Sequence, residues 1–500
     1  MTAALNLRYI LNGLRNDGVI LTRFQRRQDS GTDEEHPLFL QPLLLSFSTM
    51  HIRPHVLAVT MAKHAFIGPP RKSWDLATHL TVALTEDALK RQLSALNTPE
   101  DVQALRDGMD ELGKGTLPKQ VTLKEDVEIP VIHRQRAHSI VSSELSSTLD
   151  PSHYKNLKEE GSEETKSPLL GDWIEYQGSD AVSKPFRTIL YLHGGAYIMG
   201  SSLSHRRIGA MLAKWSKARV FLVNYRLAPE NSFPSGLEDA LASYLYLLED
   251  PLVPRPQDQL VLCGDSAGGG LTLSLRLLLR NIREGPDALV TPAGLSVWSP
   301  WVDLTHGEES FYSHAPFDYL PDPRPLMAPK PDGPHPPLWE GEHFYVPTSS
   351  LLKHPYVSPL WSPSLEGLGR ILVQCGEVER LRDECVKFAD RASSKEDKKD
   401  RDASCVQLEV YKDMPHVWHS FEKIPLSTPA IRRTAAYIRS ITPDDTSERG
   451  VRSKEDEEEE GSFRPGRWFI SSKDQIQPLD PILPSQSVHS VTDQCVNTSS

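Results

Sequence analysis

The stretch Gln259-Leu260-Val261-Leu262-Cys263-Gly264-Asp265-Ser266-Ala267-Gly268-Gly269-Gly270 decides how the rest of the chain is interpreted. Residues 260–263 are apolar enough for a short strand, and leucines recur through residues 271–279 as in a buried helix. Gly264, Ser266 and Gly268 stand between the two in a G-x-S-x-G pattern. A serine on so sharp a turn has a strained backbone, and small residues two before and two after it let strand and helix approach closely. The pattern therefore predicts a strand, an exposed serine hydroxyl and a buried helix over Gly268–Arg280.

A second turn follows another apolar strand, Thr188–Leu192, and reads His193-Gly194-Gly195-Ala196-Tyr197. A loop of the form H-G-G-[GA] offers backbone N–H groups to a developing oxyanion. We expect the donors to be the N–H groups of Gly195, Ala196 and Ala267, with Gly194 keeping the loop open. The methyl group of Ala196 removes no donor, but it narrows the space for an acyl group.

Two more motifs lie between these turns, Tyr225-Arg226-Leu227-Ala228-Pro229-Glu230 and Phe233-Pro234-Ser235-Gly236-Leu237-Glu238-Asp239-Ala240. With the four motifs in this order, residues 117–442 resemble the hormone-sensitive-lipase-like branch of the α/β-hydrolases, which includes arylacetamide and sterol deacetylases and many microbial esterases. The resemblance implies an α/β-hydrolase fold, with a mostly parallel central sheet and helices on both faces. It also implies a helical N-terminal cap over the acyl pocket.

In this fold the catalytic residues follow in the order nucleophile, acid, histidine. Ser266 is then the nucleophile, and it needs a base within hydrogen-bond reach because a serine hydroxyl is weakly nucleophilic at neutral pH. His416 lies in Met414-Pro415-His416-Val417-Trp418, which is similar to the family's Met-Pro-His-x-aromatic motif. The resemblance selects His416 as the base, and His419 is the alternative.

The acid is expected after the apolar strand Ile371–Cys375. The family pattern x-Asp-x-Leu-x-Asp, aligned on Leu381, puts Glu379 where the family has its catalytic aspartate. Asp383 is the alternative acid, although at the start of a helix its carboxylate is already explained by the helix dipole. If neither serves, Asp413 or an acid outside this loop must orient His416.

The sequence thus predicts a serine hydrolase that cleaves carboxylic esters, an esterase or deacetylase of small or lipid-like acyl esters, through a Ser-His-acid triad and an acyl-enzyme. The alternatives are an interfacial lipase and a catalytically inactive, hydrolase-derived binding module. No metal or cofactor is expected, since the chain has no H-E-x-x-H, no Walker loop and no G-x-G-x-x-G. The expected partner is a small-molecule or lipid ester.

Three regions are distinguished along the 500 residues. Residues 1–116 are expected to form the helical cap and 117–442 the catalytic domain. Within that domain we expect an exposed loop insertion at 139–167, rich in Ser, Glu and Lys, and a lid-like, proline-rich insertion at 313–347. Residues 443–500 contain the acidic run Glu455–Glu460 and are expected to be a disordered acidic tail.

The formal net charge of −12 argues against a nucleic-acid partner. Five scattered cysteines without a C-x-x-C pair favour a reducing compartment, and we expect a cytoplasmic protein that could associate with the surface of the endoplasmic reticulum. His36–Ile52 is a stretch of seventeen residues without Asp, Glu, Lys or Arg, and it falls short of the length of a span. With Pro54–Ile67 it is the candidate for peripheral membrane contact by the N-terminal region.

Overall fold

Apolar segments of five to seven residues form the centre of the molecule as parallel strands in the computed structural model. The structure describes residues 53–149, 168–177, 187–283, 288–322, 343–393, 405–442 and 466–479. The ten strands are β1 (Val121–Ile129), β2 (Leu169–Tyr176), β3 (Arg187–Leu192), β4 (Ala218–Val223), β5 (Leu260–Asp265), β6 (Gly294–Trp298), β7 (Arg370–Gly376), β8 (Cys405–Tyr411), β9 (Gly466–Ile470) and β10 (Ile476–Pro478).

These strands make one sheet in the order β1-β2-β4-β3-β5-β6-β7-β8-β9-β10. The seven strands from β4 to β9 run parallel, while β1, β2 and β10 pair antiparallel at the two edges. Because the carboxyl ends of the parallel strands share one edge, the loops that follow β3, β5, β7 and β8 meet there.

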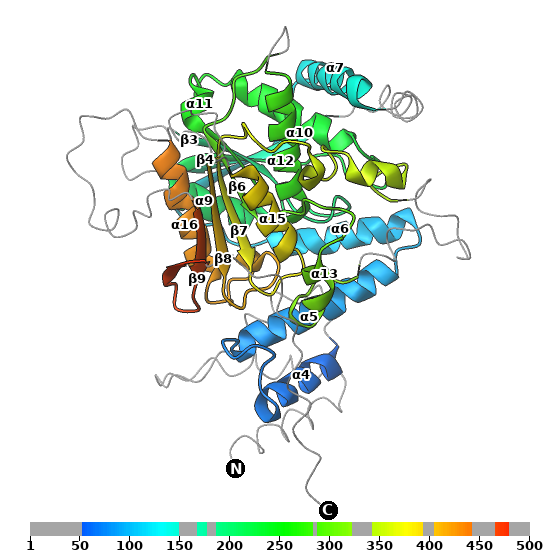
Figure 1. Cartoon of the computed structure of the whole chain (residues 1–500), viewed down its shortest axis with the longest axis vertical. Coiled ribbons are helices and arrows are strands. Elements are labelled where there is room, and N and C mark those ends of the chain that lie inside the picture. The colour runs from blue at the N-terminus through cyan, green and yellow to red at the C-terminus, as the bar shows by residue number, and fades with distance from the viewer. Residues whose placement is uncertain are drawn as a thin grey trace, which may run out of the picture.

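Helices cover both faces of the sheet (Figure 1). One face packs α9 (Arg206–Ser216) and α16 (Ser427–Ile441), whose apolar residues join those of the strands in one buried cluster. The opposite face packs α10 (Ser235–Leu248), α12 (Ser266–Asn281) and α15 (Arg382–Ala392). This arrangement confirms the predicted α/β-hydrolase fold with a mostly parallel sheet.

The short helices lie in the connections. They are α11 (Pro256–Gln259), α13 (Glu309–Ser313), η1 (Ala315–Phe317), η2 (Ser349–Lys353), η3 (Pro359–Trp361) and η4 (Trp418–Ser420).

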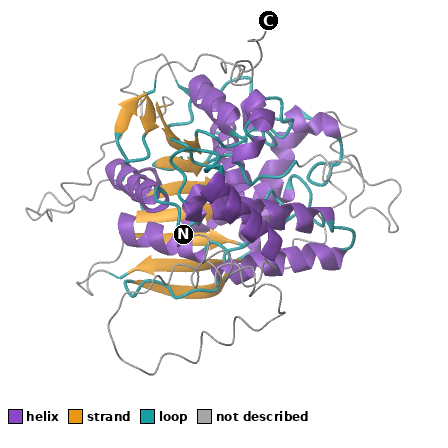
Figure 2. Ribbon diagram, turned by 90° about the horizontal axis from the view of Figure 1, so that it is seen from below, coloured by secondary structure: helices purple, strands orange, loops and turns teal. Residues whose placement is uncertain are grey.

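The N-terminal region is helical as far as the structure describes it, with α4 (Pro54–Phe66), α5 (Leu76–Ser94) and α6 (Pro99–Gly113). Thr98 caps α6 with the Asp101 capping box that its sequence predicts. The cap lies over the loops at the carboxyl edge, since Arg106 donates hydrogen bonds to the carbonyl oxygens of Ile198 and Ala228. Figure 2, seen from below, shows the strands as one stack with helices on both sides.

Two predicted boundaries are wrong. The loop insertion expected at 139–167 begins as helix: α7 (Val131–Thr148) buries Ile140, Val141 and Leu145 against α10, and residues 150–167 lie outside the described part of the chain. The disordered tail expected from 443 contains β9, whose Ile470 is fully buried beside β8. Trp468, Phe469 and Ile470 supply enough apolar surface to extend the sheet, despite the acidic composition around them.

Membrane contact by the N-terminal region remains a prediction. His36–Ile52 lies outside the described residues. The helix α4 leaves Val59 and Phe66 exposed, followed by exposed Ile67. Within the described residues, no helix combines the length and apolar character that crossing a membrane requires.

Candidate active site

Ser266 occupies a sharp turn between a strand and a helix, as its sequence predicts. The strand β5 ends at Asp265, α12 begins at Ser266, and the serine has φ +51°, in the left-handed region. A Cβ on Gly264 would lie 2.5 Å from the carbonyl oxygen of Gly268, and a Cβ on Gly268 would lie 2.1 Å from that of Leu192. Both glycines are therefore required for helix and strand to approach so closely.

His416 lies on the loop after β8, and its ring faces Ser266. Its Nε2 is 2.9 Å from the Ser266 Oγ, and the histidine is 2% exposed. His419, the alternative base, turns away: its Nε2 is 3.0 Å from the Gln374 Oε1, and its ring stacks on Trp298 at 4.3 Å. Burial lowers the pKa of His419 well below its usual value, so it remains a neutral member of the core.

Glu379 is fully buried behind His416. Its Oε1 lies 3.9 Å from the His416 Nδ1, while its Oε2 accepts hydrogen bonds from the Ser299 Oγ at 2.6 Å and the Gly376 N–H at 2.8 Å. Burial raises the pKa of Glu379, and the facing His416 opposes that rise. The separation from Nδ1 is that of an ion pair rather than a hydrogen bond, and such catalytic contacts commonly tighten when substrate binds.

The two other candidate acids are directed elsewhere. Asp383 Oδ2 accepts the Ser310 N–H at 3.0 Å, and Asp383 pairs with Arg382 at the start of α15. Asp413 accepts hydrogen bonds from Arg71 Nε at 2.5 Å and from Ser73 Oγ at 2.6 Å. Of the three carboxylates, Glu379 is the one that faces the His416 ring.

Buried charges set the protonation of His416. Burial by itself lowers its pKa, but the Glu379 carboxylate outweighs that effect, with smaller contributions from Asp318 and Asp265. The pKa of His416 is therefore raised above its ordinary value. Such a base takes the serine proton more readily than an unassisted imidazole does.

The oxyanion loop keeps its N–H groups available through an unusual backbone. Gly195, Ala196 and Tyr197 all have positive φ, at 120°, 54° and 62°. Within the described residues, the N–H groups of Gly195 and Ala196 donate to no acceptor of the protein. Ala267 lies in the first turn of α12, where N–H groups have no partner inside the helix.

Gly194 has a different part in this loop. Its N–H donates to the Asp265 Oδ1 at 3.0 Å, and a Cβ at this position would lie 2.3 Å from the Asp265 Oδ2. The same Oδ1 accepts the Tyr191 hydroxyl at 2.8 Å. Asp265 thus anchors the oxyanion loop, and Gly194 lets the loop pass close to it rather than offering its own N–H.

Two features of this site could not be predicted from any motif in the sequence. The first is Asp318, a buried carboxylate that accepts the backbone N–H of His416. The second is the 71–74 segment of the cap, in which Arg71, Ser73 and Trp74 all donate hydrogen bonds to Asp413, three residues before His416. Both depend on contacts between residues far apart in the chain, so no local pattern could reveal them.

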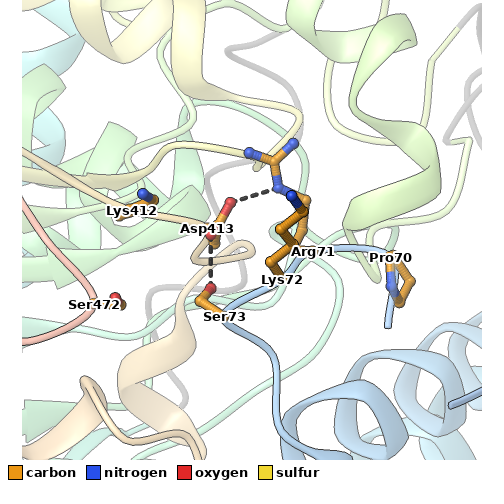
Figure 3. A pocket seen from close by; sticks show the side chains of 7 residues that line it. All are labelled: Pro70, Arg71, Lys72, Ser73, Lys412, Asp413 and Ser472. Atoms are coloured by element: carbon orange, nitrogen blue, oxygen red, sulfur yellow. Dashed lines mark hydrogen bonds and ion pairs between the residues drawn. The ribbon is translucent and has the colours of Figure 1, made fainter. Parts of the chain in front are cut away.

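The 71–74 segment borders a cavity of 590 Å³ beside the His416 loop (Figure 3). Its lining residues are Pro70, Arg71, Lys72, Ser73, Lys412, Asp413 and Ser472. Within the part of the chain that the structure describes, no three His, Cys, Asp or Glu side chains are grouped as metal ligands.

Comparison with known proteins places this geometry in a family. Residues 189–420 match the profile of a family with the alpha/beta hydrolase fold. An acetyl-hydrolase of Streptomyces hygroscopicus is 31% identical over 279 residues, which are 56% of this chain and 82% of the relative. An esterase of Acinetobacter venetianus is 30% identical over 270 residues, covering 54% of this chain and 77% of the relative.

Solved structures of esterases have the same fold. Crystals of EstE5 soaked with p-nitrophenyl butyrate gave a structure 27% identical in sequence, with a TM-score of 0.51 over 72% of this chain and 99% of that one. A hormone-sensitive lipase from a metagenome library is 26% identical, with a TM-score of 0.50 over 71% of this chain and 97% of that one. Similarity to bacterial esterases along most of their sequences and nearly all of their folds makes this chain a member of the hormone-sensitive-lipase-like family of α/β-hydrolases, and a carboxylic ester hydrolase.

Proposed function

We propose that the chain hydrolyses esters of small acyl groups through a Ser266-His416-Glu379 triad and an acyl-enzyme. The observation that carries the proposal is the 2.9 Å contact between the Ser266 Oγ and the His416 Nε2, on a serine held at φ +51°. Support for a small acyl group comes from the relative named acetyl-hydrolase.

The first half of the reaction builds the acyl-enzyme. The Ser266 Oγ attacks the ester carbonyl while its proton passes to the His416 Nε2. The carbonyl oxygen becomes an oxyanion, which the N–H groups of Gly195, Ala196 and Ala267 stabilise. When the tetrahedral intermediate collapses, the bond to the alkoxy oxygen breaks, and that oxygen leaves as an alcohol with the proton from His416.

The second half releases the acid. A water molecule gives a proton to the His416 Nε2 as its oxygen attacks the acyl carbon, and the Ser266 Oγ leaves with that proton. Glu379 is not protonated in either half. Its charge orients the imidazole and stabilises the imidazolium, which is the part that the buried acid has in this class of triad.

The test is Ser266→Ala, assayed on p-nitrophenyl esters of graded chain length. We expect turnover to fall by at least about a thousandfold, because loss of a triad member removes the covalent route. A fluorophosphonate probe should add its mass to the wild type and leave the variant unlabelled. Because Ser266 fills no core space, the melting temperature should stay near that of the wild type.

A matched control is Ser274→Ala, two turns further along α12, where the buried hydroxyl has no acceptor within the described residues. This variant should keep wild-type turnover and labelling. Labelling of Ser266→Ala with turnover above about 1% would assign the nucleophile to another residue. Activity that appears only above the solubility limit of a long-chain ester would identify an interfacial lipase instead.

A further inference from the structure

We propose that Asp318 is a positioning residue of the active site, whose carboxylate joins the loop that carries Glu379 to the loop that carries His416. The inference rests on the proposed function, since it concerns the same triad. Asp318 lies just after η1, at the start of the proline-rich insertion expected to act as a lid. Its side chain is directed into the protein rather than over a substrate.

Three backbone N–H groups donate to this one carboxylate. The Oδ1 accepts the N–H of His416 at 3.1 Å and that of Tyr319 at 2.8 Å, and the Oδ2 accepts the N–H of Arg380 at 2.7 Å. Asp318 is 1% exposed, so water cannot replace these bonds. A buried carboxylate with three such donors is held in one orientation.

These hydrogen bonds fix the distance between the loop that carries Glu379 and the loop that carries His416, which neither loop could set alone. Arg380 directly follows Glu379, and the Asp318 carboxylate therefore holds the backbone of the acid loop and that of the histidine loop on its two oxygens. Ser299 makes a second bridge, because its hydroxyl donates to the Glu379 Oε2 and accepts the Val417 N–H at 3.1 Å. Catalysis by a triad is sensitive to displacements of about 1 Å, so such bridges bear directly on turnover.

Asp318 also contributes charge to the environment of the base. The titratable groups that act on His416 come from several elements: Glu379 from the loop after β7, Asp265 from the end of β5, His419 from its own loop, and Asp318. The ring of Tyr319 covers another side of the imidazole, edge to face at 5.9 Å. The negative charge of Asp318 favours the imidazolium that forms when His416 takes the serine proton.

The experiment compares Asp318→Asn with Asp318→Glu by the pH dependence of kcat/KM on a soluble ester. Asparagine keeps the shape but removes the charge and one acceptor. For Asp318→Asn we expect kcat to fall at least about tenfold and KM to change little. The acidic limb of its kcat/KM profile should move to lower pH by about half a unit or more. Glutamate retains the charge, so its acidic limb should stay near the wild-type midpoint even if its melting temperature falls.

Glu384→Gln is the matched control for a purely structural effect. Glu384 is a fully buried carboxyl group that accepts the backbone N–H groups of Val302 and Asp303, and its pKa is raised well above the usual value by burial. Among the described residues it makes no hydrogen bond or ion pair with His416, and it is not among the carboxylates that raise the pKa of that histidine. Its replacement should lower the melting temperature without moving the acidic limb.

The outcomes separate this inference from the proposed function. If Ser266 is labelled by fluorophosphonate and Ser266→Ala is inactive, the triad stands. If Asp318→Asn then keeps the wild-type kcat and the wild-type midpoint of the acidic limb, the positioning role of Asp318 is overturned while the proposed triad is not. Full activity of Ser266→Ala would instead overturn the proposed function, whatever Asp318 does.

Discussion

At the scale of single residues, the site combines a strained serine with a buried acid that is one methylene longer than the family's aspartate. A non-glycine residue at φ +51° costs about 1–3 kcal/mol, which the packing of Gly264 and Gly268 must offset. The additional methylene of Glu379 moves its carboxylate along the loop. The donors of Ser299 and Gly376 then hold the Oε2, leaving the Oε1 for His416.

Replacing the acid should separate Glu379 from Asp383. We expect Glu379→Gln to lower kcat by about a thousandfold or more, because an amide does not stabilise the imidazolium. Asp383→Asn loses the Ser310 contact and a helix-end charge, so it should cost about 1 kcal/mol of stability and leave kcat near the wild type. Steady-state kinetics and thermal melting of both variants make the comparison. A large loss of kcat in Asp383→Asn alone would reverse the assignment.

The pH dependence tests the state of the base. His416 acts when neutral, and its pKa is raised above the ordinary value of 6.5 by Glu379, against the effect of burial. Activity should therefore be lost as the pH falls through a midpoint above 6.5, seen in the profile of kcat/KM. Removing the charge in Glu379→Gln should move the acidic limb of the kcat/KM profile, measured on the residual activity, to lower pH. A wild-type midpoint clearly below 6.5 would contradict this picture.

At the scale of elements, the cap is attached to the catalytic loops as well as lying over them. The Arg71 guanidinium pairs with Asp413 on the histidine loop and, at 3.7 Å, with Glu377 on the acid loop. It also lies 5.3 Å from the centre of the Phe317 ring, next to Asp318. The 71–74 segment therefore contacts from outside the two loops that Asp318 joins from inside, as well as the segment next to Asp318 itself.

Arg71→Ala should show this attachment. The variant leaves Asp413, whose side chain is 5% exposed, without its cation. We expect a loss of about 1–2 kcal/mol in stability, moderated by solvent because Arg71 is itself partly exposed. We also expect kcat to fall about tenfold as the His416 loop shifts. Chemical denaturation and steady-state kinetics measure the two effects.

Lys72→Ala is the control, because Lys72 is exposed, lines the same cavity and makes no ion pair with the described residues. It should match the wild type in both assays. An equal loss in the two variants would indicate a general effect of charge rather than the Arg71–Asp413 pair.

The sequence predicts best those elements whose residues are all buried, such as strands covered on both faces. The apolar runs predicted at Thr188–Leu192, 260–263 and Ile371–Cys375 form β3, β5 and β7 to within two residues, because strands buried on both faces are apolar throughout. The strand β2 escapes prediction since Gly171, Asp172 and Glu175 interrupt its apolar residues. The buried Asp172 accepts hydrogen bonds from Arg206 of α9 and from the Asp126 N–H, and no local pattern in the sequence predicts these contacts.

The site divides in the same way. Ser266 and the oxyanion loop are recognised from short motifs, because close backbone approaches and positive φ angles within each turn require their glycines. The choice between Glu379 and Asp383 stays open in the sequence, because the two residues share one loop and differ only in where that loop turns. Asp318 and Arg71 lie 98 and 342 residues from the partners they hold, His416 and Asp413, and only the folded chain brings them together.

At the scale of the whole molecule, the strand β9 also contacts the histidine loop. The strand β9 pairs with β8, and the Lys412 N–H donates to the Ile470 carbonyl oxygen at 2.8 Å. Trp468 and Ile470 pack with Tyr411, Met414 and Trp418 around that loop. The catalytic sheet is therefore continued by residues that lie beyond the region matched by the family profile.

Truncation should measure how much this extension stabilises the molecule. A chain that ends at Pro465 loses β9 and β10, and burial of Ile470 alone accounts for about 2 kcal/mol. We expect its melting temperature to fall by at least about 5 °C, with reduced turnover on a soluble ester. A chain that ends at Leu479 keeps both strands and should behave as the full chain does. Equal melting temperatures for the two truncations would show that β9 contributes nothing.

The contacts that residues 71–74 and 466–470 make with the histidine loop have a consequence for synthesis on the ribosome. A nascent chain that has emerged as far as Ile441 already contains Ser266, Glu379 and His416, and its 71–74 segment can already bind Asp413. It still lacks β9, so the loop that carries the base is held from one side only. We therefore expect ester hydrolysis at full rate only after Ile470 has left the exit tunnel, although the unfinished polypeptide already carries the proposed triad.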